Sequence, residues 1–543
     1  MKKTISFFCV LLGLTLHAQT FFQKTISDPV NEYRIYDTYA CGDGNTVFTG
    51  TVDSAGTSIF VAKADSSGLL LWMKKLDFNQ YPYYQFSPAR VRESIGGGYY
   101  LFGSFNSQID FNSLYCLLLR LDQNGNMLWS KGYEVTPPEN TISFGSCQFF
   151  SDILQDSMGQ YYFGGSTVDD MTLFKADSSG NLAWGRTFVP DSCNGINPAI
   201  CFGLCNNGDL LLAGVRNFDR TLIRVDAGGQ MLWVKIASAL NAYCRIDHMV
   251  RLPGGDFCLA GSYSDMNSDY GALWRFDDQG NLIWQKNYQL TSSAPGDYLK
   301  FMQVLVLPNG NLVVTGVFSA GIAESNIVFA TDSAGNILQT VILHPGMCAF
   351  NADTPLAPSN TSDGNLLLGA GMKLSDCFSQ TITPNGIANL IAKTPVNLNM
   401  LCASGNISVN VSPYQPQEVI TNQCTVYNVG NQLSVSPVLT PILSASLVDY
   451  CPLLSAGEVQ AEEEGFAVSP NPVPDGGPVT LAFSGSFSGK IIVSDMLGRT
   501  ITESVVSDRL SFALETTGIS KGLYIVHAHE SEGRVFSARL IVK

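Results

Sequence analysis

LDQNGNMLWSKG, residues 121–132, contains an Asp, a Gly three residues after it and a Trp seven residues after it. Five copies keep all three residue types at this spacing, and a sixth has Gln339 in the Trp position. Successive aspartates lie 49 to 57 residues apart, as the steps from 177 to 226 and from 65 to 122 show. The complete copies contain Asp65 and Trp72, Asp122 and Trp129, Asp177 and Trp184, Asp226 and Trp233, and Asp277 and Trp284.

A second motif alternates with the first and has a Gly-bearing turn, about five apolar residues and a small residue. Because glycine has no side chain, it lets another backbone segment approach closely at that point. A period near fifty residues with two hairpin turns per unit is typical of radial or stacked β-repeats. The second motif ends at Gly50, Gly103, Gly165, Gly214, Gly261 and Gly316, and a seventh copy, DGNLLLGAG, starts at Asp363.

The fold we predict is all-β, with four-stranded repeats arranged as a seven-bladed β-propeller. TFFQKTI, residues 20–26, matches IWQKNY at 283–288 and has Phe22 in the Trp position. Pairing of this first strand with the last sheet would close the ring and hide its edges. A weak further copy, ITPNGIANLI from Ile382, has Thr383 where Asp is expected, and it is a turn, an extra strand or an exit segment.

The repeated residues allow a structural and a ligand-binding interpretation. Asp and Gly together favour a tight turn, since Asp accepts hydrogen bonds from nearby amides and Gly adopts positive φ. A calcium loop is the alternative, but one Asp supplies too few oxygen ligands. The Trp residues favour packing between repeats, with a stacking surface for sugars or a quinone as the alternative. We therefore expect no metal and no cofactor.

The chain divides into four segments by composition. Lys2 and Lys3 precede a short apolar run, which predicts a signal peptide over residues 1–18. The propeller repeats occupy 19–395, and 396–465 reads as a connector with short strands, or a small second β-unit, ending in an acidic linker. Alternating apolar residues and regular turns predict an immunoglobulin-like β-sandwich over 466–543.

The last segment contains a distinctive set of residues at turns, at strand starts and at its end: Pro470, Asn471, Pro472, Gly498, Gly522, Tyr524 and Lys543. Through these residues it resembles the type A C-terminal sorting domain of the Bacteroidetes type IX secretion system. This resemblance implies export through the periplasm to a secreted or outer-surface location, recognition by the secretion machinery, and release or attachment to surface lipopolysaccharide. Residues 20–395 resemble the tryptophan-docked repeats of quinoprotein-type and other bacterial propellers. This resemblance implies a fold, and it implies no cofactor for this chain because the sequence lacks matching quinone-binding residues.

Function is less constrained than fold. The formal net charge of −15 argues against a nucleic-acid surface, and no later segment reaches transmembrane length. The sequence contains no nucleophile, metalloprotease or phosphate-loop motif, so we predict no catalytic residue. The sequence does not decide whether the protein is an enzyme, but the missing motifs argue against it.

We expect a protein that binds a glycan or another protein through loops on one face of the propeller. The alternatives are a hydrolase or lyase with acids at the channel, and a structural surface component. The candidate ligand-binding residues are Tyr81, Tyr83 and Tyr84.

Overall fold

Every regular element that the computed structural model describes is a β-strand. The strands form two compact units, one within residues 1–455, called the ring unit here, and one within 456–543, called the C-terminal unit. The predicted signal peptide lies outside the described residues. Described are residues 21–28, 31, 33–52, 58–77, 84–107, 114–135, 150–166, 171–190, 200–216, 219–237, 243–264, 269–291, 297–320, 323–343, 347–349, 356–376, 382–398, 404–405, 409–414, 424–428, 432–434, 438–449, 466–469, 473, 477–495, 500–519, 522–530 and 535–542.

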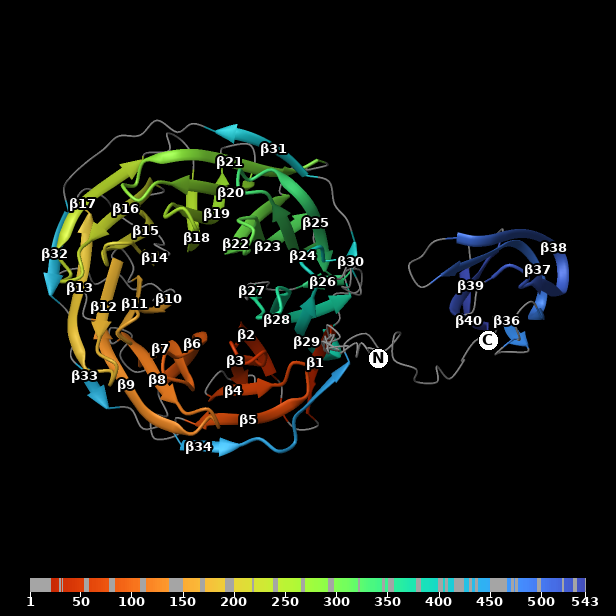
Figure 1. Cartoon of the computed structure of the whole chain (residues 1–543), viewed down its shortest axis with the longest axis horizontal. Helices are drawn as coiled ribbons and strands as arrows, with labels where there is room; N and C mark the ends of the chain where they lie inside the picture. Colours follow the sequence, from red (N-terminus) through yellow and green to blue (C-terminus); the bar gives the residue numbers. More distant parts are fainter. Residues whose placement is uncertain are drawn as a thin grey trace, which may run out of the picture. The chain divides into compact units, whose positions relative to one another are not determined.

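Six antiparallel meanders of four strands follow one another around the ring unit (Figure 1). The first strand of each meander lies nearest the centre, and the fourth lies toward the outside. One parallel bridge, between Asp269 and Tyr298, joins the fifth and sixth meanders. The strands are β2 (Tyr33–Ala40), β3 (Thr46–Val52), β4 (Ser58–Ala64), β5 (Leu70–Asp77); β6 (Tyr84–Glu93), β7 (Tyr99–Ser107), β8 (Leu114–Leu121), β9 (Met127–Val135); β10 (Phe150–Gln155), β11 (Tyr161–Ser166), β12 (Met171–Ala176), β13 (Leu182–Pro190); β14 (Ile200–Leu204), β15 (Leu210–Arg216), β16 (Asp219–Val225), β17 (Met231–Ala237); β18 (Tyr243–Arg251), β19 (Phe257–Ser264), β20 (Asp269–Phe276), β21 (Leu282–Leu290); and β22 (Tyr298–Val306), β23 (Leu312–Ala320), β24 (Ala323–Thr331), β25 (Ile337–Leu343).

The remaining sheet of the ring unit joins the beginning of the repeat region to its end. The N-terminal strand β1 (Phe22–Ser27) pairs with β29 (Ile382–Thr394), with Phe22 opposite Lys393. The pairing expected from the match between residues 20–26 and the Trp strands is therefore present. The sheet also contains β26 (Met347–Ala349), β27 (Ala357–Asn360) and β28 (Leu366–Asp376). Thr383 lies within β29, at a place where the register of β29 against β28 shifts between Ile382 and Ile387.

Six short strands after Leu398 add to the outside of these sheets, and we call them the belt. They pair in chain order with β25, β21, β13, β9, β5 and β1, so the belt passes the sheets in the reverse of their own order (Figure 1). The belt ends beside the strand that closes the ring, and its strands extend the existing sheets rather than building a separate one. The belt comprises β30 (Ser404–Gly405), β31 (Val409–Tyr414), β32 (Cys424–Asn428), β33 (Gln432–Ser434), β34 (Val438–Pro441) and β35 (Ser446–Asp449).

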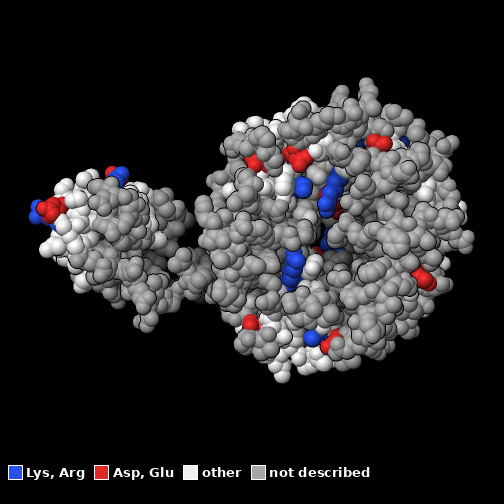
Figure 2. Space-filling view, turned by 180° about the vertical axis from the view of Figure 1, so that it is seen from behind, with Lys and Arg blue, Asp and Glu red and all other residues white. Residues whose placement is uncertain are grey.

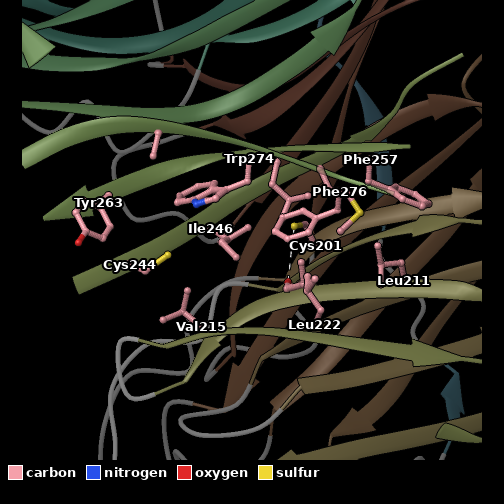
Figure 3. Packing of buried hydrophobic residues seen from close by; sticks show 14 of the residues in the cluster. Cys201, Leu211, Val215, Leu222, Cys244, Ile246, Phe257, Tyr263, Trp274 and Phe276 are labelled. Atoms are coloured by element: carbon pink, nitrogen blue, oxygen red, sulfur yellow. Dashed lines mark hydrogen bonds between the residues drawn. The ribbon is translucent and has the colours of Figure 1, made fainter. Parts of the chain in front are cut away.

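Neighbouring sheets pack face to face, and this packing forms the core. Every residue of β3 and β4 is buried, whereas only Met73 and Leu76 are buried in β5. The middle strands therefore contribute most of the core, and the outer strand is largely at the surface. Figure 3 shows one such interface, where Cys201 and Leu211 of one meander meet Ile246, Phe257 and Trp274 of the next.

The C-terminal unit is built around one long strand. β37 (Pro478–Asp495) pairs with β36 (Phe466–Ser469) along its first part, with β39 (Gly522–Glu530) along its last part, and with β38 (Thr500–Glu515) along both. β40 (Val535–Val542) completes the sheet beside β39. The buried apolar core includes Leu481, Val493 and Val526. In the described parts of the chain, no helix is long and apolar enough to cross a membrane.

Candidate ligand site at the ring axis

The repeated aspartates are used within their own turns. Asp122 Oδ1 accepts hydrogen bonds from the backbone N–H groups of Asn124 and Asn126, both at 2.8 Å, and Gly125 has a φ of 72°. Asp65, Asp177, Asp226, Asp277 and Asp332 accept the same pair of hydrogen bonds in their turns. The described residues contain no group of three or more His, Cys, Asp or Glu that could hold a metal ion.

Each repeated Trp lies against the glycine of the next repeat's turn. A Cβ added at Gly125 would lie 2.8 Å from the Trp72 ring, and one at Gly280 would lie 2.4 Å from the Trp233 ring. Gly180, Gly229 and Gly335 stand in the same relation to Trp129, Trp184 and Trp284, and Gly68 to Phe22. The glycine therefore serves both the turn and the neighbouring ring. These indoles contact the next meander.

A cation two residues after the Trp strengthens the same junction. Lys235 Nζ lies 5.0 Å from the Trp233 ring centroid and donates a 2.8 Å hydrogen bond to Asn281 Oδ1 in the next turn. Lys74, Lys131 and Lys286 repeat this arrangement with Asn126, Asn181 and Asn336. The Trp and Lys residues of the first motif therefore join each repeat to the turn of the next one.

The glycine of the second motif shapes the strand nearest the axis. Gly50, Gly261 and Gly316 pair with Ile35, Ile246 and Phe301, and the inner strand skips one residue immediately afterwards. A Cβ on these glycines would lie 1.8, 1.9 and 2.0 Å from the carbonyl oxygens of Arg34, Arg245 and Lys300. The expectation that the small residue permits a close backbone approach is therefore confirmed. The approach fixes the backbone of a cationic residue in three of the meanders.

These three cations lie at the same end of the inner strands. Tight turns such as 41–45 and 65–69 close one end of the meanders, and each inner strand begins at the opposite end, where the connections from the previous meander arrive. Arg34, Arg245 and Lys300 are the second, third and third residues of their strands. Figure 2 shows Lys and Arg side chains around a hollow at the middle of one face, with most visible Asp and Glu nearer the rim.

Arg245, Asp247 and Lys300 form an electrostatically coupled group. Arg245 Nε donates a 2.7 Å hydrogen bond to Asp247 Oδ1. Burial raises the pKa of Asp247, although the positive charges of Arg245 and Lys300 oppose this shift. Lys300 Nζ lies 4.1 Å from the Tyr298 ring centroid, and no described residue forms an ion pair with it. Two cations facing one carboxylate give the group a net positive charge.

Deeper along the same strands, polar residues join one inner strand to the next. Asp37 Oδ2 accepts a 2.8 Å hydrogen bond from the backbone N–H of Val91 and another from Arg92. His248 Nδ1 accepts a 3.4 Å hydrogen bond from the backbone N–H of Val304. Asp37 and His248 occupy equivalent positions, each directly after the skipped residue. Their hydrogen bonds therefore assign both residues to the inner wall of the ring.

The partly buried His248 predicts a pH dependence of stability. Burial, followed by the charges of Arg90 and Arg92, lowers the pKa of His248 to about 3. Below the ordinary histidine pKa of about 6.5 the unfolded chain therefore binds a proton that the folded chain does not, and the free energy of unfolding falls by about 1.4 kcal/mol per pH unit as the pH decreases. Urea unfolding at pH 7, 6 and 5 should show this slope, and H248Q should lack it. Equal slopes in both proteins would contradict the assignment.

The structure covers the predicted site residues unevenly. Tyr81 and Tyr83 lie outside the described residues, and Tyr84 is the first residue of β6. Gly522 and Tyr524 lie in β39, where Tyr524 is buried opposite Leu540. The other sorting-domain positions, Pro470, Asn471, Pro472, Gly498 and Lys543, lie outside the described residues.

Sequence reasoning missed the axial cations, although a signal for them exists. Arg34, Arg245 and Lys300 each precede the glycine of the second motif by 16 residues (50 − 34, 261 − 245, 316 − 300). The motif itself was recognised as a turn and a strand. Aligning the preceding strand on the same glycine would have revealed three cations at one position of the repeat.

The comparisons with known proteins bear mainly on the end of the chain. Among solved structures, polysaccharide lyase Uly1 is 9% identical with a TM-score of 0.40, covering 69% of this chain and 100% of that one. A protein from Lactobacillus plantarum is 14% identical with a TM-score of 0.38, covering 66% and 99%. A protein of unknown function from Bacteroides caccae is 12% identical with a TM-score of 0.34, covering 57% and 94%. No curated protein matches the chain.

Residues 467–543 match the secretion system C-terminal sorting domain. This match coincides with the C-terminal unit, whose described strands begin at Phe466. It supports export by the type IX secretion system, recognition by that machinery and a final location outside the cell, secreted or at the cell surface.

Proposed function

We propose that the ring unit is a seven-bladed β-propeller that binds a glycan or a protein at the end of its axis where successive meanders connect. The single observation that carries this proposal is the placement of Arg34, Arg245 and Lys300 at that end of the inner strands. The repeated Asp and Trp residues are occupied in joining the repeats, whereas these cations are not part of those junctions. A net positive group at the centre of a chain with net charge −15 favours a role in binding.

The number of blades, the fold of the C-terminal unit and the details of export are part of the same proposal. Six meanders and a sheet closed by β1 support seven blades. The long strand β37, which changes partners along its length, supports an immunoglobulin-like sandwich in the C-terminal unit. A cleaved signal peptide over residues 1–18, an origin in Bacteroidetes and attachment to surface lipopolysaccharide follow from the sequence and its resemblance to sorting-domain proteins.

The alternatives are a hydrolase or lyase and a structural surface component. A hydrolytic site of two carboxylates requires a second acid near the first. Beside the axial cations, Asp247 is hydrogen-bonded to Arg245. His248 uses its Nδ1 within the ring wall. These contacts favour binding over catalysis.

Glycan and protein arrays probed with the chain from residue 19 onward test the proposal. We expect binding to at least one class of ligand, and reduced binding when Tyr81, Tyr83 and Tyr84 are replaced together by Ala if the loops contribute. Retained binding in that variant would remove the three tyrosines from the site. Absence of binding on both arrays would favour the structural surface component.

A further inference from the structure

We propose that the ligand at the axis is an acidic polysaccharide whose carboxylate or sulfate group binds between Lys300 and Arg245. This inference rests on the proposed binding function and specifies the ligand class. Asp247 accepts a hydrogen bond from a sugar hydroxyl group beside the bound anion.

Charge is the first argument for an anionic ligand. The cations at this end of the inner strands stand out in a chain with 46 acidic and 31 basic side chains. Lys300 has no ion-pair partner among the described residues, and its ammonium group lies over the aromatic ring of Tyr298. A cation held near an anionic partner in a hollow attracts that partner more strongly than a cation on an open surface, because water screens the charge less there.

Preorganisation is the second argument. The Arg245 side chain is 52% exposed. Its backbone carbonyl oxygen, however, packs tightly against Gly261, since a Cβ added there would lie only 1.9 Å from this oxygen. Gly316 constrains Lys300 in the same way at 2.0 Å. The exposed charges thus extend from rigid strands, which lowers the entropy lost when they order around a ligand.

Asp247 distinguishes a polysaccharide from an acidic peptide. Its Oδ1 accepts the hydrogen bond from Arg245, and no described residue donates to its Oδ2. Asp247 Oδ2 repels an anion placed directly against it but accepts a hydrogen bond from a hydroxyl group, so the ligand's anion lies toward the two cations and a hydroxyl group lies toward Asp247. A uronic acid or a sulfated sugar supplies an anion and hydroxyl groups within one ring, whereas an acidic peptide segment supplies carboxylates without hydroxyls.

Matched charged and neutral sugars test this inference by isothermal titration of the chain from residue 19 onward. The charged probes are oligogalacturonate for carboxylate and dextran sulfate for sulfate, and the neutral controls are methyl-esterified oligogalacturonate and dextran. We expect one of the charged probes to bind, its neutral control to bind at least tenfold more weakly, and the affinity to fall with added salt. A polyglutamate peptide is expected not to bind.

Charge-neutral variants locate the site. K300Q and R245Q should each weaken binding of the charged probe about tenfold or more, since a hydrogen bond to a charged group contributes at that level. K74Q is the matched control, because Lys74 contacts the tight turn at Asn126 at the other end of the meander. Its affinity should equal that of the unmodified chain.

The outcomes separate the two proposals. Equal binding of charged and neutral sugars, or binding that K300Q and R245Q leave unchanged, would overturn the anion site while leaving the binding function intact. Binding of polyglutamate with no binding of either charged sugar would replace the polysaccharide with an acidic protein. Absence of binding to these probes together with negative arrays would overturn both proposals.

Discussion

Replacing Gly261 by Ala is expected to lower the free energy of unfolding of the ring unit by about 3 kcal/mol or more. The new methyl group would lie 1.9 Å from the carbonyl oxygen of Arg245, a contact that forces β18 away from β19. Because the displaced residue is an axial cation, the variant should also weaken binding of the anionic sugar. Urea unfolding followed by tryptophan fluorescence measures the first effect.

Gly254 supplies the control for this prediction. It belongs to the tight turn of the same meander, and a Cβ there would meet nothing within 4 Å. G254A should therefore change the free energy of unfolding by no more than about 0.5 kcal/mol. If G261A were as stable as G254A, the glycine would not be constraining the inner strand, and the positional argument for Arg245 would fail.

Replacing Trp233 by Ala is expected to lower the free energy of unfolding by about 3 kcal/mol. The indole covers Gly280 in the next repeat and is partly buried there, so its removal leaves a gap between two meanders. Lys235 also loses the aromatic ring beside which it lies, 5.0 Å from the ring centroid. Thermal and urea unfolding of the variant measure the loss.

The neighbouring Leu232 is the matched control, since its side chain is 53% exposed. L232A removes an apolar side chain from the same strand without opening the junction, and we expect a change below about 1 kcal/mol. Equal effects of W233A and L232A would show that the repeated Trp contributes no more than an exposed apolar residue, contrary to its assigned role.

The turns and their neighbours could be predicted because their chemistry is local. Asp122 accepts hydrogen bonds from amides of its own turn, and Gly125 supplies the positive φ of that turn. These two residue types at this spacing therefore indicate the turn without any information about the rest of the fold. Phe22 was recognisable because the strand around it repeats a pattern present elsewhere in the chain. Its contact with Gly68 places it in the role that Trp has at the other junctions.

The belt and the axial group could not be derived in the same way. The strands after Leu398 have no repeat period, and their partners are edges hundreds of residues earlier, such as Asp77 for Val438. Thr383 looked like a degenerate turn position, and it lies within β29 where the register against β28 shifts. Lys300 and Arg245 share one position of the repeat, 16 residues before the second-motif glycine, but their approach to each other follows only from the arrangement of the repeats around one axis.

Closure of the ring through its N-terminal strand is the claim on which the axial site depends, because an open array of sheets has no common centre. Cysteine pairs introduced at the opposed residues Gln23 and Ala392, and separately at Lys24 and Ile391, test it directly. After mild oxidation of the folded chain, we expect a disulfide-linked peptide by mass spectrometry in at least one of the two variants, since opposed strand residues lie within disulfide reach. Absence of a linked peptide in both variants, in chains that remain folded, would contradict the closed ring.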